Sequence, residues 1–179
     1  TSALFLDPSS PACIAKSIHF MGLPEIRQPF EHLADIVRSG RTTLHGEGTV
    51  EPDHPVWVDF AHSMAPMMGA MAAPLGAIVL NGSTGPLNVL DIAAGHGLFG
   101  IAVAKQNPQA RVVAVDWPNV LNVAEENARL AGVADRFHKL PGSAFDVDYG
   151  GPHDLVLLTN FLHHFDHGTC VNLLKKVYA

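Results

Sequence analysis

Short apolar runs alternate with helical patterns along the second half of the chain. The runs have the β-branched, apolar character of buried strands, and they fall at residues 88–93, 111–115, 137–140 and 154–159. Helical patterns follow the first two runs, one from Leu98 onward and one over residues 119–131. Strands that alternate with helices favour a parallel sheet with right-handed crossovers. We therefore expect an α/β fold with a Rossmann-like parallel sheet.

The first part of the chain shows helical periodicity instead. Ser10 followed by a proline is typical of a helix start, and it predicts a helix that runs to about Met21. A second helix is expected to begin at Pro24 and to stop at Gly40, because glycine suits the position after a helix C-terminus. The polar stretch over residues 41–54 is expected to be a loop.

A third helix follows, and we expect it to kink or restart near Pro66 and Pro74. It holds an uncharged run, Met64 to Leu80, that is nearly long enough to cross a membrane. Prolines and glycines interrupt this run and no basic cluster flanks it, so we expect a buried helix and no membrane partner. The chain then divides into a helical segment, residues 1–80, and a sheet domain, residues 81–179.

Composition narrows the class of protein. The chain has 179 residues, of which 47% are hydrophobic and 16% are charged, and this excludes a disordered chain. The formal net charge is -6 and no basic stripe is visible, so we expect no nucleic-acid partner. Cys13 and Cys170 lie far apart without metal-type spacing, which favours a reducing, cytoplasmic location. The chain begins at Thr1 and stops within an amphipathic pattern, so we expect a fragment of a larger protein.

Glycines follow the first expected strand in the stretch LNVLDIAAGHGLFG, residues 87–100. Gly95, Gly97 and Gly100 have the G-x-G-x-x-G spacing of a cofactor loop. Glycine allows the backbone to approach a ligand closely, and the next helix directs its free N–H groups and positive dipole end toward that ligand. This spacing alone fits more than one class of cofactor.

Two acidic residues separate the cofactor classes. A dinucleotide places its pyrophosphate at the helix start, where the carboxylate of Asp91 is an unfavourable neighbour. S-adenosylmethionine carries a sulfonium and an ammonium group, so an acid that leads into the loop suits it better. Asp116 ends the second strand, where an acid can accept from both ribose hydroxyls of either cofactor. Alternatively, Asp91 caps a turn and Asp116 caps the following helix.

Two further stretches follow later strands. PGSAF, residues 141–145, leaves the third strand where Ser143 can bond an adenine and Phe145 can cover it, although a plain turn fits equally well. NFLHHFDH, residues 160–167, lies at the carboxyl end of the fourth strand, where α/β sheets place ligands. His163 or His164 there is a candidate general base for a hydroxyl. His163 and His167 lie four residues apart, but no third ligand is evident and we expect no metal.

With these residues, nearly the whole chain resembles the class I S-adenosylmethionine-dependent O-methyltransferases of the plant caffeate and acetylserotonin type and their bacterial relatives. DIAAGHG is similar to the glycine-rich first motif of that family, AVDW to its ribose-binding acid, PGSAF to its adenine loop and NFLHHFDH to its catalytic segment. The resemblance implies a sheet made of the first four strands of that fold. It also implies that the helical segment before the sheet lines the substrate pocket.

The resemblance assigns roles to individual residues. His163 takes the position of the catalytic base, and Phe60 and Met64 take positions that shape the methyl-transfer pocket. The positions that bind S-adenosylmethionine are Asp91, Gly95, Gly97, Asp116, Trp117, Ser143, Ala144, Phe145 and Asn160.

The chain departs from the family pattern at three positions. Ala93 replaces the usual first glycine, Ser143 replaces the acid of the adenine loop, and Thr159 replaces a lysine that often precedes the catalytic segment. Family members also carry an N-terminal winged-helix dimerisation domain and later strands, which we expect before Thr1 and after Ala179. The parent protein is therefore expected to be a homodimer.

The leading hypothesis is an O-methyltransferase that acts on a hydroxyl of a small, aromatic or flat apolar molecule. A nicotinamide-dependent oxidoreductase on a related sheet is the second hypothesis. A third is a binding or assembly protein that keeps the methyltransferase fold without its chemistry.

Overall fold

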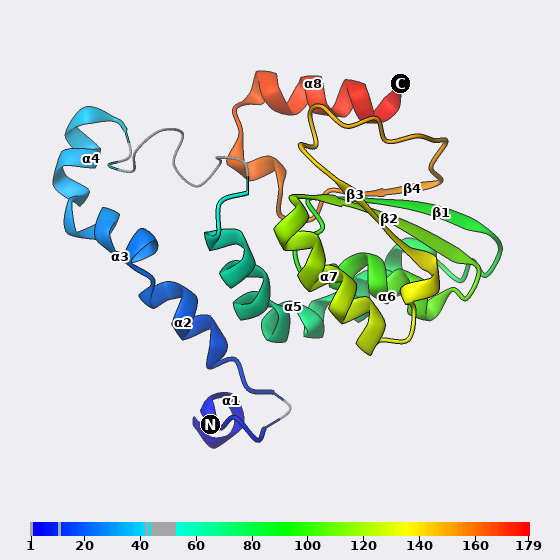
Figure 1. Ribbon diagram of the computed structural model, residues 1–179, viewed down its shortest axis with the longest axis horizontal. Helices are drawn as coiled ribbons and strands as arrows, with labels where there is room; N and C mark the ends of the chain where they lie inside the picture. Colours follow the sequence, from blue (N-terminus) through cyan, green and yellow to red (C-terminus); the bar gives the residue numbers. More distant parts are fainter. Residues whose placement is uncertain (1, 11, 42, 44–52) are drawn as a thin grey trace.

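Four parallel strands form the centre of the computed structural model, which describes residues 2–10, 12–41, 43 and 53–179 (Figure 1). The strands are β1 (Leu87–Ile92), β2 (Ala110–Asp116), β3 (Phe137–Pro141) and β4 (Leu155–Leu157). Their order in the sheet is β3-β2-β1-β4, and all three pairings are parallel. The expected Rossmann-like sheet is confirmed, and the carboxyl ends of its strands share one edge.

Helices cover both faces of the sheet. Figure 1 shows α5 (Val56–Leu80), α6 (Leu98–Gln106) and α7 (Pro118–Leu130) on one side and α8 (His167–Tyr178) on the other. Strand alternation explains the two layers, because Val89 packs in the core with α6 and α7 while Leu90 and Ile92 pack with Leu173 of α8. The crossover helices α6 and α7 thus cover one face of the sheet and α8 covers the other, so the strands are buried on both faces.

Helix α5 is the bridge between the helical segment and the sheet. Its Ala72 and Leu80 belong to the same core as β1 and α6. By length and composition α5 is able to cross a membrane, yet it packs along α6 and α2 (Lys16–Gly22). It neither ends nor restarts at Pro66 or Pro74. The division of the chain at residues 80 and 81 remains a prediction.

The N-terminal helices differ from their expected bounds. They are α1 (Ser2–Leu6), α2, α3 (Pro24–Glu31) and α4 (Leu33–Ser39), and none of them contains a buried residue. The helix expected from Ser10 begins only at Lys16, because the Ser10 hydroxyl donates to the carbonyl of Leu4 and closes a turn. Pro11 and most of the expected loop over residues 41–54 lie outside the described residues.

The helix expected over residues 24–39 is two helices. Pro29 lies inside α3 and lacks the N–H that continues a helix, and α3 ends two residues after it. Gly40 caps α4 in the left-handed conformation, with a φ of 68°, as its position predicts.

Candidate functional site

A cavity of about 990 Å³ opens at the carboxyl edge of the sheet. Parallel α/β sheets bind ligands at this edge, because loops from neighbouring strands meet there. Of the twelve residues to which the resemblance gives a role, nine line this cavity: Phe60, Gly95, Asp116, Trp117, Ser143, Ala144, Phe145, Asn160 and His163. Asp91, Gly97 and Met64 are not among its lining residues, and all three are buried. The strand ends, together with α5, therefore bring segments that are far apart in the sequence to one cavity.

Asp91 lies beneath the glycine loop. Its side chain is fully buried, and Oδ2 accepts a hydrogen bond of 3.0 Å from the backbone N–H of Gly100. Oδ1 is also buried and has no hydrogen-bond partner among the described residues. Burial raises the pKa of Asp91 to about 7, and the nearby charge of Asp116 adds to the increase. Asp91 thus ties the loop to α6 from below, and direct contact with a cofactor stays a prediction.

Asp116 lies at the end of β2 and faces the cavity. Its Oδ2 accepts from the N–H of Gly95 at 2.8 Å, and its Oδ1 accepts from the N–H of Trp117 at 2.7 Å. Burial raises the pKa of Asp116 to about 6, although these two hydrogen bonds oppose the change. This carboxylate both fixes the tip of the glycine loop and lines the space above it.

The glycine loop is held by the side chains of the protein itself. Besides Gly95 and Gly100, the N–H of Leu98 donates to Nδ1 of His96 at 3.2 Å. Two carboxylates and one imidazole therefore already accept from three backbone N–H groups of this loop. In a dinucleotide-binding loop, such N–H groups point toward the ligand instead. Gly97 serves packing, since a Cβ there lies 2.9 Å from the Cβ of Ala124.

His96 is a lining residue that sequence reasoning missed. Its side chain is buried at the base of the cavity, and its ring lies 5.7 Å from the ring of Phe99. Burial lowers the pKa of His96 to about 4, so the imidazole is neutral at physiological pH. The only signal in the sequence was its place between two glycines of the loop.

The segment after β3 forms a second wall. The N–H of Gly142 donates to the carbonyl of Asp116 at 2.9 Å, so this segment begins beside the β2 acid. Lys176 of α8 donates to the carbonyl of Ala144 at 3.1 Å, and the hydroxyl of Tyr149 donates to the same oxygen. Ser143 and the residues after it are thereby held at the cavity, where the sequence placed the adenine loop.

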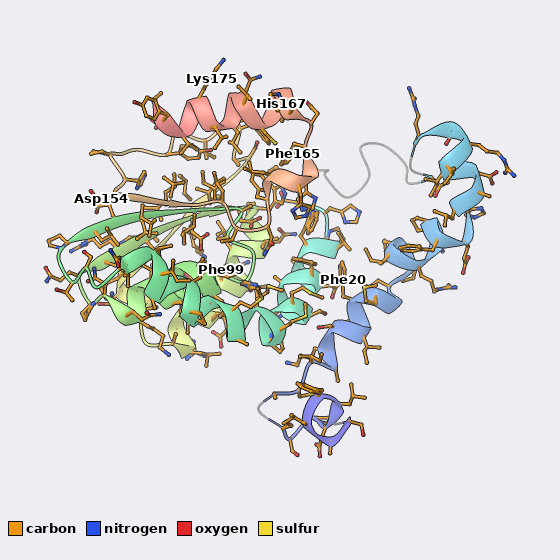
Figure 2. All side chains as sticks on the ribbon, turned by 180° about the vertical axis from the view of Figure 1, so that it is seen from behind. Phe20, Phe99, Asp154, Phe165, His167 and Lys175 are labelled. Atoms are coloured by element: carbon orange, nitrogen blue, oxygen red, sulfur yellow. The ribbon has the colours of Figure 1, made fainter. Side chains whose placement is uncertain are left out.

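Aromatic rings form the remaining wall. The ring of Phe165 lies 5.1 Å from Phe145 and 5.0 Å from Phe161, both edge to face. Figure 2 shows Phe165 and Phe20 on opposite sides of the start of α5. Phe20 packs edge to face on Phe60 at 5.2 Å, and Phe60 packs likewise on Trp57 at 5.6 Å. This part of the cavity is thus lined by flat apolar surfaces.

The two candidate bases lie in a short 3-10 helix, Leu162–His164, beside these rings. The imidazoles of His163 and His164 lie 4.2 Å apart, and His164 packs edge to face on Trp57. Burial, together with His163, lowers the pKa of His164. His163 is exposed and lines the cavity, whereas His167 does not line it. Within the described residues, no three His, Cys, Asp or Glu side chains form a group able to hold a metal ion.

Residues 30–179 match the model of a protein family described as the O-methyltransferase domain. The chain belongs to this O-methyltransferase family. The expected family is therefore confirmed, and the glycine loop, the β2 acid and the histidine segment all fall inside the matched region.

Some relatives of this O-methyltransferase domain align with nearly all of it. Mitomycin biosynthesis 6-O-methyltransferase of Streptomyces lavendulae is 27% identical over 99% of this chain and 51% of its own. A Nostoc punctiforme protein, solved as a candidate O-methyltransferase, is 52% identical with a TM-score of 0.94, over 99% of this chain and 53% of its own. Human N-acetylserotonin methyltransferase, solved with SAM, shares the fold at 21% identity and a TM-score of 0.72, over 99% of this chain and 52% of its own.

The domain spans about half the length of these relatives. The matched fold accounts for the helical segment as well as the sheet, because the Nostoc structure covers both. The comparisons assign no role to any single residue of the cavity.

Proposed function

We propose that this chain is the cofactor-binding part of an S-adenosylmethionine-dependent O-methyltransferase that acts on a hydroxyl of a small aromatic or flat apolar molecule. Membership of the O-methyltransferase family supports the reaction class. The proposal of S-adenosylmethionine as the cofactor rests on the glycine loop, in which side chains of Asp91, His96 and Asp116 already accept hydrogen bonds from backbone N–H groups. A cationic ligand suits such a loop, whereas a pyrophosphate meets buried acids and few free N–H groups.

The cavity fits the parts of this cofactor in turn. We propose that Asp116 accepts from the ribose hydroxyls and that the segment from Ser143 to Phe145 encloses the adenine, because these residues line the cavity. Asn160 and Gly95 line the same cavity and are proposed to contact the rest of the cofactor. When bound, the cofactor supplies an electrophilic methyl group on a sulfonium. The charged cofactor would then lie against the acidic loop, and the flat substrate would lie against the apolar wall.

We propose that His163 is the general base. Like His164, it is exposed and lines the cavity, so it is able to take a proton from a substrate hydroxyl and pass it to solvent. His164 is less suited, because it packs against Trp57 and its pKa is lowered. Phe60 lines the cavity and is proposed to shape the methyl-transfer pocket, whereas Met64 is buried in α5 and does not line the cavity. Most of the rate enhancement is expected from holding the hydroxyl in line with the methyl group.

The same proposal extends to the parent protein, which we expect to be a cytoplasmic homodimer without nucleic-acid or membrane partners. The acidic charge of -6 supports the absence of a nucleic-acid partner. Two relatives, a 3-amino-4-hydroxybenzoate 4-O-methyltransferase and a phenazine O-methyltransferase, support the proposal of a small ring-shaped substrate.

Calorimetric titration of the full-length protein with S-adenosylhomocysteine and with NADH tests the cofactor. We expect only the first to bind. Asp116→Asn should weaken this binding about 10- to 100-fold, because charge-assisted hydrogen bonds to two hydroxyls are lost. Asp135→Asn is the matched control, since Asp135 is exposed and does not line the cavity.

Binding of NADH alone would establish the oxidoreductase hypothesis instead. Binding of S-adenosylhomocysteine without methyl transfer to any phenol in a substrate panel would favour the non-catalytic binding protein. Equal binding by the wild type and Asp116→Asn would contradict the role proposed for the β2 acid.

A further inference from the structure

His96 is held rigidly within the glycine loop. Its ring Nδ1 accepts from the N–H of Leu98 at 3.2 Å, and its backbone carbonyl accepts from the side-chain amide of Asn127 at 2.8 Å. Only 5% of its surface is exposed, and it is one of the residues that line the cavity. Both the ring and the backbone of His96 are thus fixed before any ligand arrives.

The hydrogen bond at Nδ1 determines the tautomer. Because Nδ1 accepts a hydrogen bond, the proton of the neutral imidazole is on Nε2. No described residue forms a hydrogen bond with Nε2. Nε2 is not one of the buried side-chain atoms that lack a partner, so it reaches the open space of the cavity, where a ligand or water is able to accept from it. His96 therefore presents one unused N–H donor at the cavity.

The groups around Nε2 of His96 indicate which kind of ligand group accepts its hydrogen bond. The nearby backbone donors of Gly95, Leu98 and Gly100 are already engaged. Phe99 packs on the ring and Met68 of α5 also lines the cavity, so neither supplies a hydrogen bond there. Among the side chains of residues 93–97, His96 is therefore the one that is able to donate to an anionic group of a ligand.

We propose that Nε2 of His96 donates a hydrogen bond to the carboxylate at the methionyl end of the cofactor. This inference rests on the proposed function, since that carboxylate is the only anionic group of S-adenosylmethionine. A neutral donor suits this place, because a charged imidazolium would repel the sulfonium of the same ligand. Burial keeps the ring uncharged, with a pKa of about 4.

Two substitutions separate the donor from the loop contact. The side chain of His96→Asn is able to accept from the N–H two residues ahead, as Asn commonly does, but it has no donor at the position of Nε2. The side chain of His96→Gln is longer and is able to place an amide N–H there. Thermal unfolding without ligand checks that both variants keep the fold.

The experiment is calorimetric titration of the full-length protein with S-adenosylhomocysteine and with 5′-methylthioadenosine, which lacks the amino-acid end. We expect His96→Asn to bind S-adenosylhomocysteine about tenfold more weakly and methylthioadenosine unchanged. We expect His96→Gln to recover most of the affinity for S-adenosylhomocysteine.

Equal weakening for both ligands would show that His96 only shapes the loop, and it would overturn the inference. Unchanged binding of S-adenosylhomocysteine by His96→Asn would overturn it as well, while leaving the proposed cofactor intact. If the wild type binds neither ligand, the proposed function fails and the inference falls with it.

Discussion

The two sides of the cavity are built on different principles. The loop side, formed by residues 93–97 and Asp116, is fixed by hydrogen bonds between backbone N–H groups and buried side chains. The aromatic side, formed by Trp57, Phe60 and residues 161–165, is fixed by edge-to-face ring contacts within each of two distant segments and by the contact of Trp57 with His164 between them. On the loop side the backbone donors of Gly95, Leu98 and Gly100 are engaged, whereas the aromatic side offers apolar surface and two histidines.

This contrast separates two tasks. Hydrogen bonds to backbone leave little freedom, so the loop side is suited to one invariant ligand. Ring contacts tolerate changes of size and angle, so the aromatic side is suited to substrates that vary among relatives. We therefore expect substitutions on the loop side to affect cofactor affinity or stability, and substitutions on the aromatic side to affect turnover.

The largest expected effect is on turnover, from His163→Ala. Loss of a general base should lower kcat of the full-length enzyme about 10²- to 10⁴-fold, while the affinity for S-adenosylhomocysteine stays within about twofold. Single-turnover rates and calorimetry measure the two quantities. His167→Ala is the matched control, because His167 belongs to the same segment but does not line the cavity. A normal rate in His163→Ala combined with a slow rate in His164→Ala would move the base to His164.

The next effect is on stability, from Gly97→Ala. The new Cβ would lie 2.9 Å from the Cβ of Ala124 and 3.1 Å from the ring of Phe137, at a φ of +73° that disfavours alanine. We expect the free energy of unfolding to fall by roughly 2–4 kcal/mol, from overpacking and backbone strain together. Chemical denaturation measures the change.

Gly85→Ala is the control for Gly97→Ala, since nothing lies within 4 Å of a Cβ there. It should be neutral or slightly stabilising. A Gly97→Ala protein as stable as wild type would mean that the loop side is less rigid than its contacts indicate.

The smallest effect is a pH dependence of cofactor affinity. The pKa of Asp116 is raised to about 6, so its carboxyl is protonated below that pH and ionised above it. Ribose hydroxyls donate to the ionised form, so affinity should increase about tenfold from pH 5 to pH 7.5. Calorimetry in buffers across this range measures it. In Asp116→Asn the affinity should vary much less with pH, and the variation that is left would come from Asp91. If the variant kept the same pH dependence as the wild type, the assignment of this dependence to Asp116 would be contradicted.

Much of the fold could be predicted from the sequence because β1 and β2 are each followed directly by a helix in the chain. The strand runs predicted β1 to β4 within about two residues, since buried parallel strands are almost wholly apolar. The start of α2 was wrong because the Ser10 hydroxyl closes a turn with Leu4 rather than capping a helix. No local pattern distinguishes these two uses of a serine.

The site was readable only where its residues are close in the chain. Asp116 and the segment after β3 follow strand ends, so topology alone placed them at one edge. The contact between Trp57 and His164 joins positions more than a hundred residues apart, and no spacing rule predicts it. Strand alternation does place Asp91 on the face of α6, which explains why its side chain lies under the loop.

The engaged loop donors also bear on how such a chain is able to change during evolution. Conversion to a dinucleotide cofactor would need the loop to release N–H groups from Asp91, His96 and Asp116. Any single replacement frees one donor while the remaining side chains still hold the others. Intermediates on that route would lose the old cofactor before they gain a new one. Descendants of this chain are therefore expected to diversify by substrate and to keep their cofactor.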